Sequence, residues 1–329
     1  MTTNGIAIIS SGSATPDPSL NNSNLSQIVD TSDEWIASRT GIHSRRLASP
    51  ELNLSDLATT AAENALKRAE IKPDQIDLII LATSTPDDLF GSASQIQANL
   101  GASQAVAFDL TVACSGFVFG LVTAAQFIQN GVYQTVLLIG ADILSRWVDW
   151  SDRRTCVLFG DGAGAVILQR SQQNNLLGFE LRNDGRQNAC LNVSYQPSPK
   201  TLTENCTISQ GNYQAIAMNG KEVYRFAVKK VPEVIEKALY RAHLTADEID
   251  WLILHQANQR IINAVAERLN LPAEKVVSNL ANYGNTSAAS IPLALDEAVE
   301  SGRVQPGDII ATSGFGAGLS WGAAIFRWG

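Results

Sequence analysis

The chain has 329 residues and a formal net charge of -8, and 45% of its residues are hydrophobic while only 17% are charged. That length and apolar content predict a folded globular protein with a sizeable core and exclude an intrinsically disordered chain. The acidic balance argues against nucleic acid as the main partner, because binding phosphates requires a basic face.

The first residues, MTTNGIAIISSGSATP, do not have the pattern of a targeting segment. They lack a basic region followed by a long apolar stretch, and no part of the chain approaches 18 uninterrupted apolar residues. We therefore expect a cytoplasmic protein that does not bind membranes. The cysteines are widely spaced without a C-x-x-C pair, so neither a disulfide framework nor a metal site is predicted. They are Cys114, Cys156, Cys190 and Cys206.

Strand-like apolar runs alternate with helix-length segments along the first half of the chain. The runs lie near residues 77 to 83, 105 to 113 and 135 to 142, and helical patterns such as GFVFGLVTAAQFIQNG stand between them. This alternation predicts an α/β fold. A run as uniformly apolar as TVLLIG predicts a sheet that is buried on both faces.

An internal repeat connects the two halves of the sequence. Residues 65 to 81 (ALKRAEIKPDQIDLIIL) align without a gap on residues 238 to 254 (ALYRAHLTADEIDWLIL), with 9 of 17 positions identical. Helix, turn and buried strand recur, so duplication of a half-domain is the better explanation, although two such units can also converge. We place the halves at 1–172 and 173–329.

Cys114 is the cysteine with the most informative surroundings. It lies in DLTVACSGFVFG, where a strand gives way through small residues to an apolar helix that ends near Gly131. Unpaired N–H groups and the helix dipole at such a position favour the nucleophilic thiolate. The alternative is a small buried thiol. Cys156, inside TCVLFG, is expected to fill the core.

The sequence offers few candidates for a catalytic base, because it contains three histidines. His43 lies in a basic loop and His243 on the exposed side of a repeat helix. His255 instead follows the buried strand WLIL and opens a helical pattern, so it is predicted at a strand-to-helix junction like that of Cys114. A histidine in this position can also be purely structural.

Two turns rich in small residues lie near the C-terminus. Asn285 in NYGNTSAASIP stands where a turn opens the next helix, and by itself it would be a capping residue. The segment SGFGAGLSWG is predicted to be a flexible loop whose N–H groups point inward. Because it lacks the lysine of a phosphate-binding loop, as does FGDGAGAV at 159 to 166, neither segment is expected to bind a nucleotide.

Taken together, these segments resemble β-ketoacyl-acyl carrier protein synthase III, a family of the thiolase superfamily. The likeness runs from DTSDEWIASRTGI at 30 to 42 to the final WGAAIFRWG, and its most specific pieces are ACSGF, FGDGAGA, HQANQRI and GNTSAAS in that order. The resemblance implies a duplicated five-layered αβαβα sandwich and a homodimer. It also implies that Cys114 is the acylated nucleophile and that His255 and Asn285 are its catalytic partners.

The resemblance further implies how substrates bind. Coenzyme A contacts fall on Trp35, Arg39, Arg153 and Asn258, and an indole with an arginine is suited to sandwich adenine. Acetyl-CoA and malonyl-acyl carrier protein are the implied substrates, and no cofactor or metal is implied. The oxyanion of the acyl-transfer intermediate would be held by backbone N–H groups of Cys114 and Ala317.

An acidic carrier protein requires a basic docking surface, although the net charge of this chain is negative. Arg225, with Lys229 and Lys230, lies on one predicted helix, while Arg260 and Arg268 lie on the helix after His255. These residues are predicted to dock the carrier, the alternative being an ordinary solvated face.

The sequence departs from the family pattern at three positions. Ala317 stands where the family often has a glycine, and Lys221 and Arg154 replace smaller or neutral residues found in some relatives.

Several other functions remain open from the sequence alone. A related acyltransferase or polyketide starter enzyme would keep Cys114 but use the acyl group differently. A thioester hydrolase would require a base that activates water, and a non-catalytic acyl-CoA-binding protein would not require the three reactive residues. The combination of Cys114, His255 and Asn285 favours decarboxylative condensation.

Overall fold

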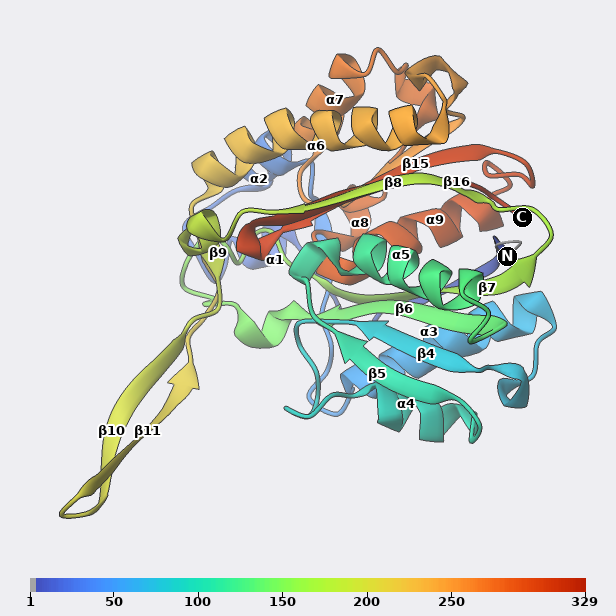
Figure 1. Cartoon of the computed structure of the whole chain (residues 1–329). Helices are drawn as coiled ribbons and strands as arrows, with labels where there is room; N and C mark the ends of the chain where they lie inside the picture. The colour runs from blue at the N-terminus through green and yellow to red at the C-terminus, as the bar shows by residue number, and fades with distance from the viewer. Residues whose placement is uncertain (1–3) are drawn as a thin grey trace.

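The computed structural model describes residues 4–329 and contains two five-stranded sheets (Figure 1). The first sheet has the strand order β1-β7-β6-β4-β5, with β1 at Gly5–Ala14, β4 at Leu78–Ala82, β5 at Val106–Leu110, β6 at Thr135–Ile143 and β7 at Asp161–Ser171. The second has the order β14-β13-β15-β16-β8, with β8 at Leu176–Asn183, β13 at Trp251–Leu254, β14 at Val276–Val277, β15 at Ile309–Gly316 and β16 at Ser320–Arg327.

The two sheets share one pairing pattern. In the first, β5, β4 and β6 are parallel, and β7 and β1 are added antiparallel. In the second, β14, β13 and β15 are parallel, and β16 and β8 are added antiparallel. The buried runs predicted for β4 and β6 are confirmed, since every residue of both strands is buried.

The predicted internal repeat is also confirmed. Helix α3 (Leu54–Ala69) and helix α6 (Gly220–Ala242) are followed by the C-capping residues Glu70 and His243, whose φ angles are 55° and 57°. Each helix is followed by a 3₁₀ turn and then by β4 or β13. Because left-handed φ values are uncommon outside glycine, their recurrence at equivalent positions is specific support for a duplicated unit.

The helices and sheets stack in five layers. Figure 1 shows α6 and α7 (Gln259–Arg268) over the second sheet, α5 (Gly116–Gln129) and α9 (Ser290–Glu300) between the sheets, and α3 and α4 (Ala93–Leu100) under the first. This is the predicted αβαβα sandwich. Glycine permits the close central packing, because a Cβ on Gly164 would lie 2.7 Å from the backbone nitrogen of Leu293 in α9.

The remaining helices and strands do not belong to the two five-stranded sheets or to the helices just described. They are β2 (Ser19–Asn21), α1 (Asn22–Leu25), α2 (Asp33–Thr40), β3 (Ser44–Arg46), β9 (Leu191–Asn192), β12 (Ala217–Met218) and α8 (Leu280–Tyr283), with β10 (Tyr195–Thr203) and β11 (Cys206–Tyr213). Strands β10 and β11 form an exposed hairpin that projects from the body (Figure 1).

The boundary between the predicted halves stays a prediction. Positions 172 and 173 lie in the connection between β7 and β8, which belong to different sheets. Within residues 4–329, no helix is both long enough and apolar enough to span a bilayer.

Candidate active site

Cys114 lies in a tight turn between β5 and α5, as its sequence surroundings predict. The turn spans Ala113–Ser115, and Ala113 has a φ of 47°, in the left-handed region that is strained for a residue with a Cβ. Small neighbours are required here, because a Cβ on Gly116 would lie 3.0 Å from the side chain of Ala82. The fold therefore presents Cys114 at the start of a buried helix, with 7% of its surface exposed.

The prediction of a resting thiolate is wrong. Burial raises the pKa of Cys114 to about 12, the Ser287 hydroxyl 3.4 Å from Sγ lowers it, and the nearby carboxylate of Asp142 raises it. The helix start does not compensate for loss of water around a charged sulfur. Cys114 is thus a protonated thiol in the free protein.

His255 follows β13 directly, as predicted, although the next helix begins at Gln259 rather than at the histidine. Burial lowers the pKa of its imidazole to about 3, so the ring is neutral. Its Nδ1 lies 2.7 Å from Oγ of Ser290, and its ring meets Phe315 edge-on with the centroids 5.2 Å apart. His255 is therefore fixed as a neutral group.

Asn285 is buried in the turn that precedes α9. Its backbone is held on both sides, because its N–H donates to Leu158 at 2.8 Å and its carbonyl accepts from Gly160 at 3.0 Å. Its side-chain oxygen accepts from the N–H of Ser287 at 2.9 Å, which is a capping interaction. This bond uses the oxygen and leaves the amide NH₂ available to the pocket.

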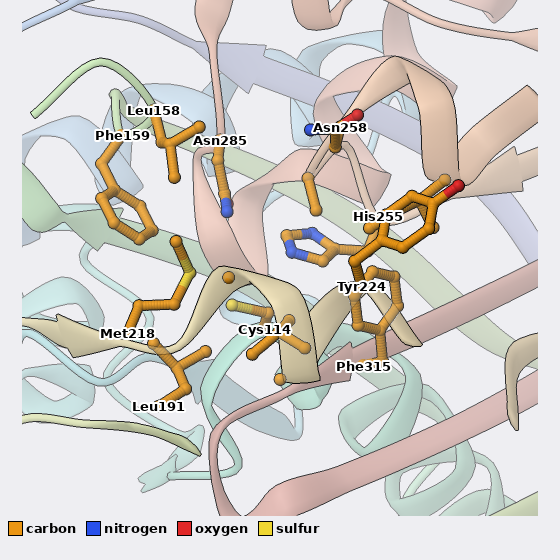
Figure 2. A pocket seen from close by; sticks show the side chains of 15 residues that line it. Cys114, Leu158, Phe159, Leu191, Met218, Tyr224, His255, Asn258, Asn285 and Phe315 are labelled. Carbon is orange, nitrogen blue, oxygen red and sulfur yellow. The ribbon is translucent and has the colours of Figure 1, made fainter. Parts of the chain in front are cut away.

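The three predicted catalytic residues line one pocket. Figure 2 shows the side chains of Cys114, His255 and Asn285 directed toward a common space. The rest of the wall is mainly apolar and comprises Leu158, Phe159, Leu191, Met218, Val223, Tyr224, Ala257, Ile261 and Phe315, with Asn258 and two glycines. Such a wall suits a short acyl chain beside polar groups that act at one point.

Three polar residues that the sequence reasoning passed over support this site. Ser287, in the turn before α9, contacts Cys114 and Asn285, and Ser290, the first residue of α9, contacts His255. Both serines belong to the motif GNTSAAS, where no role was predicted for them. Asp142, at the end of β6, accepts from Thr83, Thr85 and the N–H groups of Ser84 and Ala288. The sequence signal that could have identified Asp142 is an acidic residue near the end of a uniformly apolar strand.

The glycine-rich segment near the C-terminus is more regular than predicted. Most of it belongs to β15 and β16, and only Ala317–Leu319 form the turn between them. A Cβ on Gly316 would lie 2.9 Å from Cβ of Cys114 and 3.2 Å from its sulfur, so this backbone packs directly against the nucleophile. Gly316 lines the pocket, and Ala317 is the next residue in the chain.

The four residues predicted to contact coenzyme A lie together. The guanidinium carbons of Arg39 and Arg153 are 4.8 Å and 5.4 Å from the ring centroid of Trp35. Asn258 donates to the backbone oxygen of Arg39 at 3.0 Å and also lines the pocket of Cys114. The cluster is thus continuous with the pocket.

The basic residues predicted to dock a carrier lie on the outer helices. Arg225 is on α6 and pairs with Glu222 at 2.9 Å, and Arg260, on α7, lies over the ring of Tyr224 with 5.4 Å between Cζ and the centroid. Arg268 is exposed in the last turn of α7. Since Tyr224 also lines the pocket, Arg260 stands close to its rim.

The other candidates lie apart from this chemistry. Cys156 is fully buried, as predicted, whereas Cys190 is partly exposed and Cys206 is exposed, and both lie outside the pocket. His43 pairs with Asp33, and His243 ends α6. In the described part of the chain, no group of three or more histidine, cysteine, aspartate or glutamate side chains could hold a metal ion.

Comparison with known proteins gives consistent matches. The sequence model described as 3-oxoacyl-[acyl-carrier-protein] synthase III matches residues 108–185, and the model of its C-terminal part matches residues 239–328. The chain is 70% identical over 325 residues to a β-ketoacyl-[acyl-carrier-protein] synthase III of Nostoc sp. (strain PCC 7120), covering 99% of this chain and 98% of the relative.

Solved structures agree with these matches. The crystal structure of 3-oxoacyl-[acyl-carrier-protein] synthase III from Aquifex aeolicus aligns with a TM-score of 0.91 at 45% identity, covering 98% of this chain and all of the other. The priming β-ketosynthase of the R1128 polyketide pathway aligns with a TM-score of 0.90 at 33% identity, covering 99% and 97%.

Proposed function

The chain belongs to the 3-oxoacyl-[acyl-carrier-protein] synthase III family, and from that premise we propose that it initiates fatty acid synthesis. It condenses acetyl-CoA, or another short acyl-CoA, with malonyl-acyl carrier protein and releases CoA and CO₂. The observation that carries this proposal is the convergence of Cys114, His255 and Asn285 on one pocket.

The first step transfers the acetyl group to Cys114. The sulfur attacks the thioester carbonyl, the bond to the CoA sulfur breaks, and the thiol proton ends on that sulfur. Because burial raises the pKa of Cys114 to about 12, the proton leaves during the attack rather than before it. Backbone N–H groups of Cys114 and Ala317 hold the oxyanion, and the close packing of Gly316 on Cys114 supports this assignment.

The second step forms the carbon–carbon bond. Malonyl-acyl carrier protein loses CO₂, and the resulting enolate attacks the acyl carbonyl and expels the Cys114 thiolate, which takes up one proton. The developing enolate oxygen needs hydrogen-bond donors. The neutral ring of His255 and the free NH₂ of Asn285 supply these donors. Because these side chains stabilise the enolate, the reaction needs no resident cofactor, and the CoA thioester is a substrate.

Coenzyme A binds at the cluster of Trp35, Arg39, Arg153 and Asn258. The guanidinium groups beside the indole suit an adenine ring and phosphates. Their link through Asn258 to the pocket wall leads from the nucleotide toward Cys114. Of the residues that depart from the family pattern, Arg154 is paired with its neighbour Asp152 at 2.8 Å and Lys221 is exposed, and neither lines the pocket of Cys114.

The carrier protein docks near the pocket rim, on Arg225, Arg260 and Arg268. The enzyme acts in the cytoplasm as a homodimer. Large apolar side chains on one edge support association, since Leu89 and Phe90 are 82% and 96% exposed near β5, an edge strand of the first sheet.

The decisive experiment adds the two substrates in sequence. Labelled acetyl-CoA alone should leave label on Cys114, and later addition of malonyl-acyl carrier protein should release CO₂ and a β-ketoacyl product. A protein that carries the label but never yields that product would contradict the proposal.

A polyketide starter enzyme is the second candidate, supported by the similarity to the R1128 priming ketosynthase. The same experiment separates the two functions when carrier proteins of fatty acid and polyketide synthesis are compared as acceptors. Preference for the fatty acid carrier supports the first candidate. Transfer of the acyl group without CO₂ release would instead indicate an acyltransferase.

A further inference from the structure

The hydroxyl of Ser290 has two hydrogen-bond partners, and together they determine the direction of its O–H bond. Its Oγ lies 3.3 Å from the backbone nitrogen of Gln256, which can only donate, and 2.7 Å from Nδ1 of His255. Ser290 is 1% exposed, so bulk water does not replace either partner. The hydroxyl oxygen therefore accepts from Gln256, and its proton is left for the imidazole.

The donor N–H of Gln256 is itself held in place. The side chain of Gln256 donates to the carbonyl of Leu254 at 2.7 Å and accepts from the N–H of Asn279 at 3.2 Å. These bonds fix the residue between β13 and the segment before α8. The hydrogen-bond direction at Ser290 is consequently imposed by rigid backbone and not by a rotatable group.

The alternative arrangement leaves a buried hydrogen bond unmade. If Nδ1 of His255 carried the proton, the Ser290 oxygen would accept two bonds. Within residues 4–329, no other acceptor lies within hydrogen-bond range of the Ser290 proton. Buried hydroxyl protons without partners are unfavourable, so this arrangement is disfavoured.

We propose that Ser290 is a positioning residue that holds His255 as the tautomer protonated on Nε2, so that Nε2–H points its proton at the reacting oxygen. This inference rests on the proposed condensation, because only that reaction requires a donor at this place. With the other tautomer, Nε2 would present a lone pair to the developing enolate and repel it. Ser290 touches no substrate and acts through His255.

Nitrogen NMR of the imidazole tests the assignment directly. The protein labelled with ¹⁵N in its three histidines is compared with Ser290→Ala, and the His255 signals are identified by their loss in His255→Gln. We expect an unprotonated Nδ1 and a protonated Nε2 in the unaltered protein, and a mixed or reversed tautomer in Ser290→Ala. Ser10→Ala is the matched control, because Ser10 is equally buried and donates to Ala65 at 2.7 Å far from the site.

Kinetics complete the test. Ser290→Ala should slow condensation by about ten- to a hundredfold, while acetyl transfer from acetyl-CoA to Cys114 stays within about twofold. A proton on Nδ1 in the unaltered protein, an unchanged tautomer in Ser290→Ala, or a changed tautomer with unchanged condensation would each overturn the proposal. Failure of the unaltered protein to condense would refute the proposed function instead, and the tautomer comparison would still be decided.

Discussion

Two turns with similar backbone geometry precede the two helices that lie between the sheets. The turn Ala113–Ser115 leads into α5 and the turn Ser287–Ala289 leads into α9, and each begins with a residue in the left-handed region, at φ 47° and 50°. The first turn carries the nucleophile. The second carries no nucleophile, but its serine reaches across to the sulfur at 3.4 Å.

Duplication thus supplied one scaffold, and its two halves have different chemical roles. The junction equivalent to that of Cys114 is the turn at Ser287, not the strand end at His255 as the sequence pattern indicated. His255 instead corresponds to Ala82, at the end of β4 in the first half. The first half provides the reacting atom, and the second provides the donors and the hydroxyls that position them.

The largest expected effect comes from removing the nucleophile of the first turn. Cys114→Ala should lower acetyl labelling of the protein and overall condensation by at least about 10³-fold, because no other group can form the acyl-enzyme. Labelling is measured by intact-mass spectrometry. Cys156→Ala, which alters only a buried core thiol, is the control, and persistent condensation by Cys114→Ala would refute the covalent route.

Removal of the donors in the second half should separate the two steps. His255→Ala or Asn285→Ala should reduce condensation by about 10²- to 10³-fold, since each removes one donor to the enolate oxygen. Acetyl labelling of Cys114 should fall far less. Single-turnover assays of each half-reaction measure this split, and equal losses in both steps would show that the donors do not act specifically in decarboxylation.

The hydroxyl of Ser287 is expected to have a smaller effect. In Ser287→Ala the N–H that holds Asn285 remains, but the donor to Cys114 is lost, so alkylation of Cys114 should slow by about three- to tenfold at a given pH. Mass spectrometry of the Cys114 peptide after timed treatment with iodoacetamide measures the rate. An unchanged rate would mean that the hydroxyl does not stabilise the thiolate.

The same assay gives a pH prediction. Because the pKa of Cys114 is raised to about 12, only a small fraction is thiolate at neutral pH, and that fraction should increase about tenfold per pH unit. Alkylation of the unaltered protein should therefore keep accelerating from pH 7 to 10. A plateau near pH 8 would contradict the dominance of burial.

The sequence predicts the framework well because its signals are local. The apolar runs of β4 and β6 and the turn before α5 depend on neighbouring residues alone, and the repeat is found by comparing two short stretches of sequence. The thiolate prediction failed because burial, a property of the whole fold, outweighs the local helix start. Ser287 and Ser290 were not predicted for the same reason, since the role of a small polar residue near a turn depends on which side chains the fold packs against it.

The smallest expected effect concerns the turn of the second half that packs on Cys114. Ala317 stands where the family often has glycine, yet it is not among the residues with positive φ, so a Cβ introduces no backbone strain. Ala317→Gly should change condensation by less than about twofold, because the N–H assigned to the oxyanion is kept. It should lower the free energy of unfolding by about 0.4 to 1 kcal/mol, since glycine gives the unfolded chain more freedom. Thermal unfolding and steady-state rates measure both, and a large gain in rate would mean that the methyl group restricts access to Cys114.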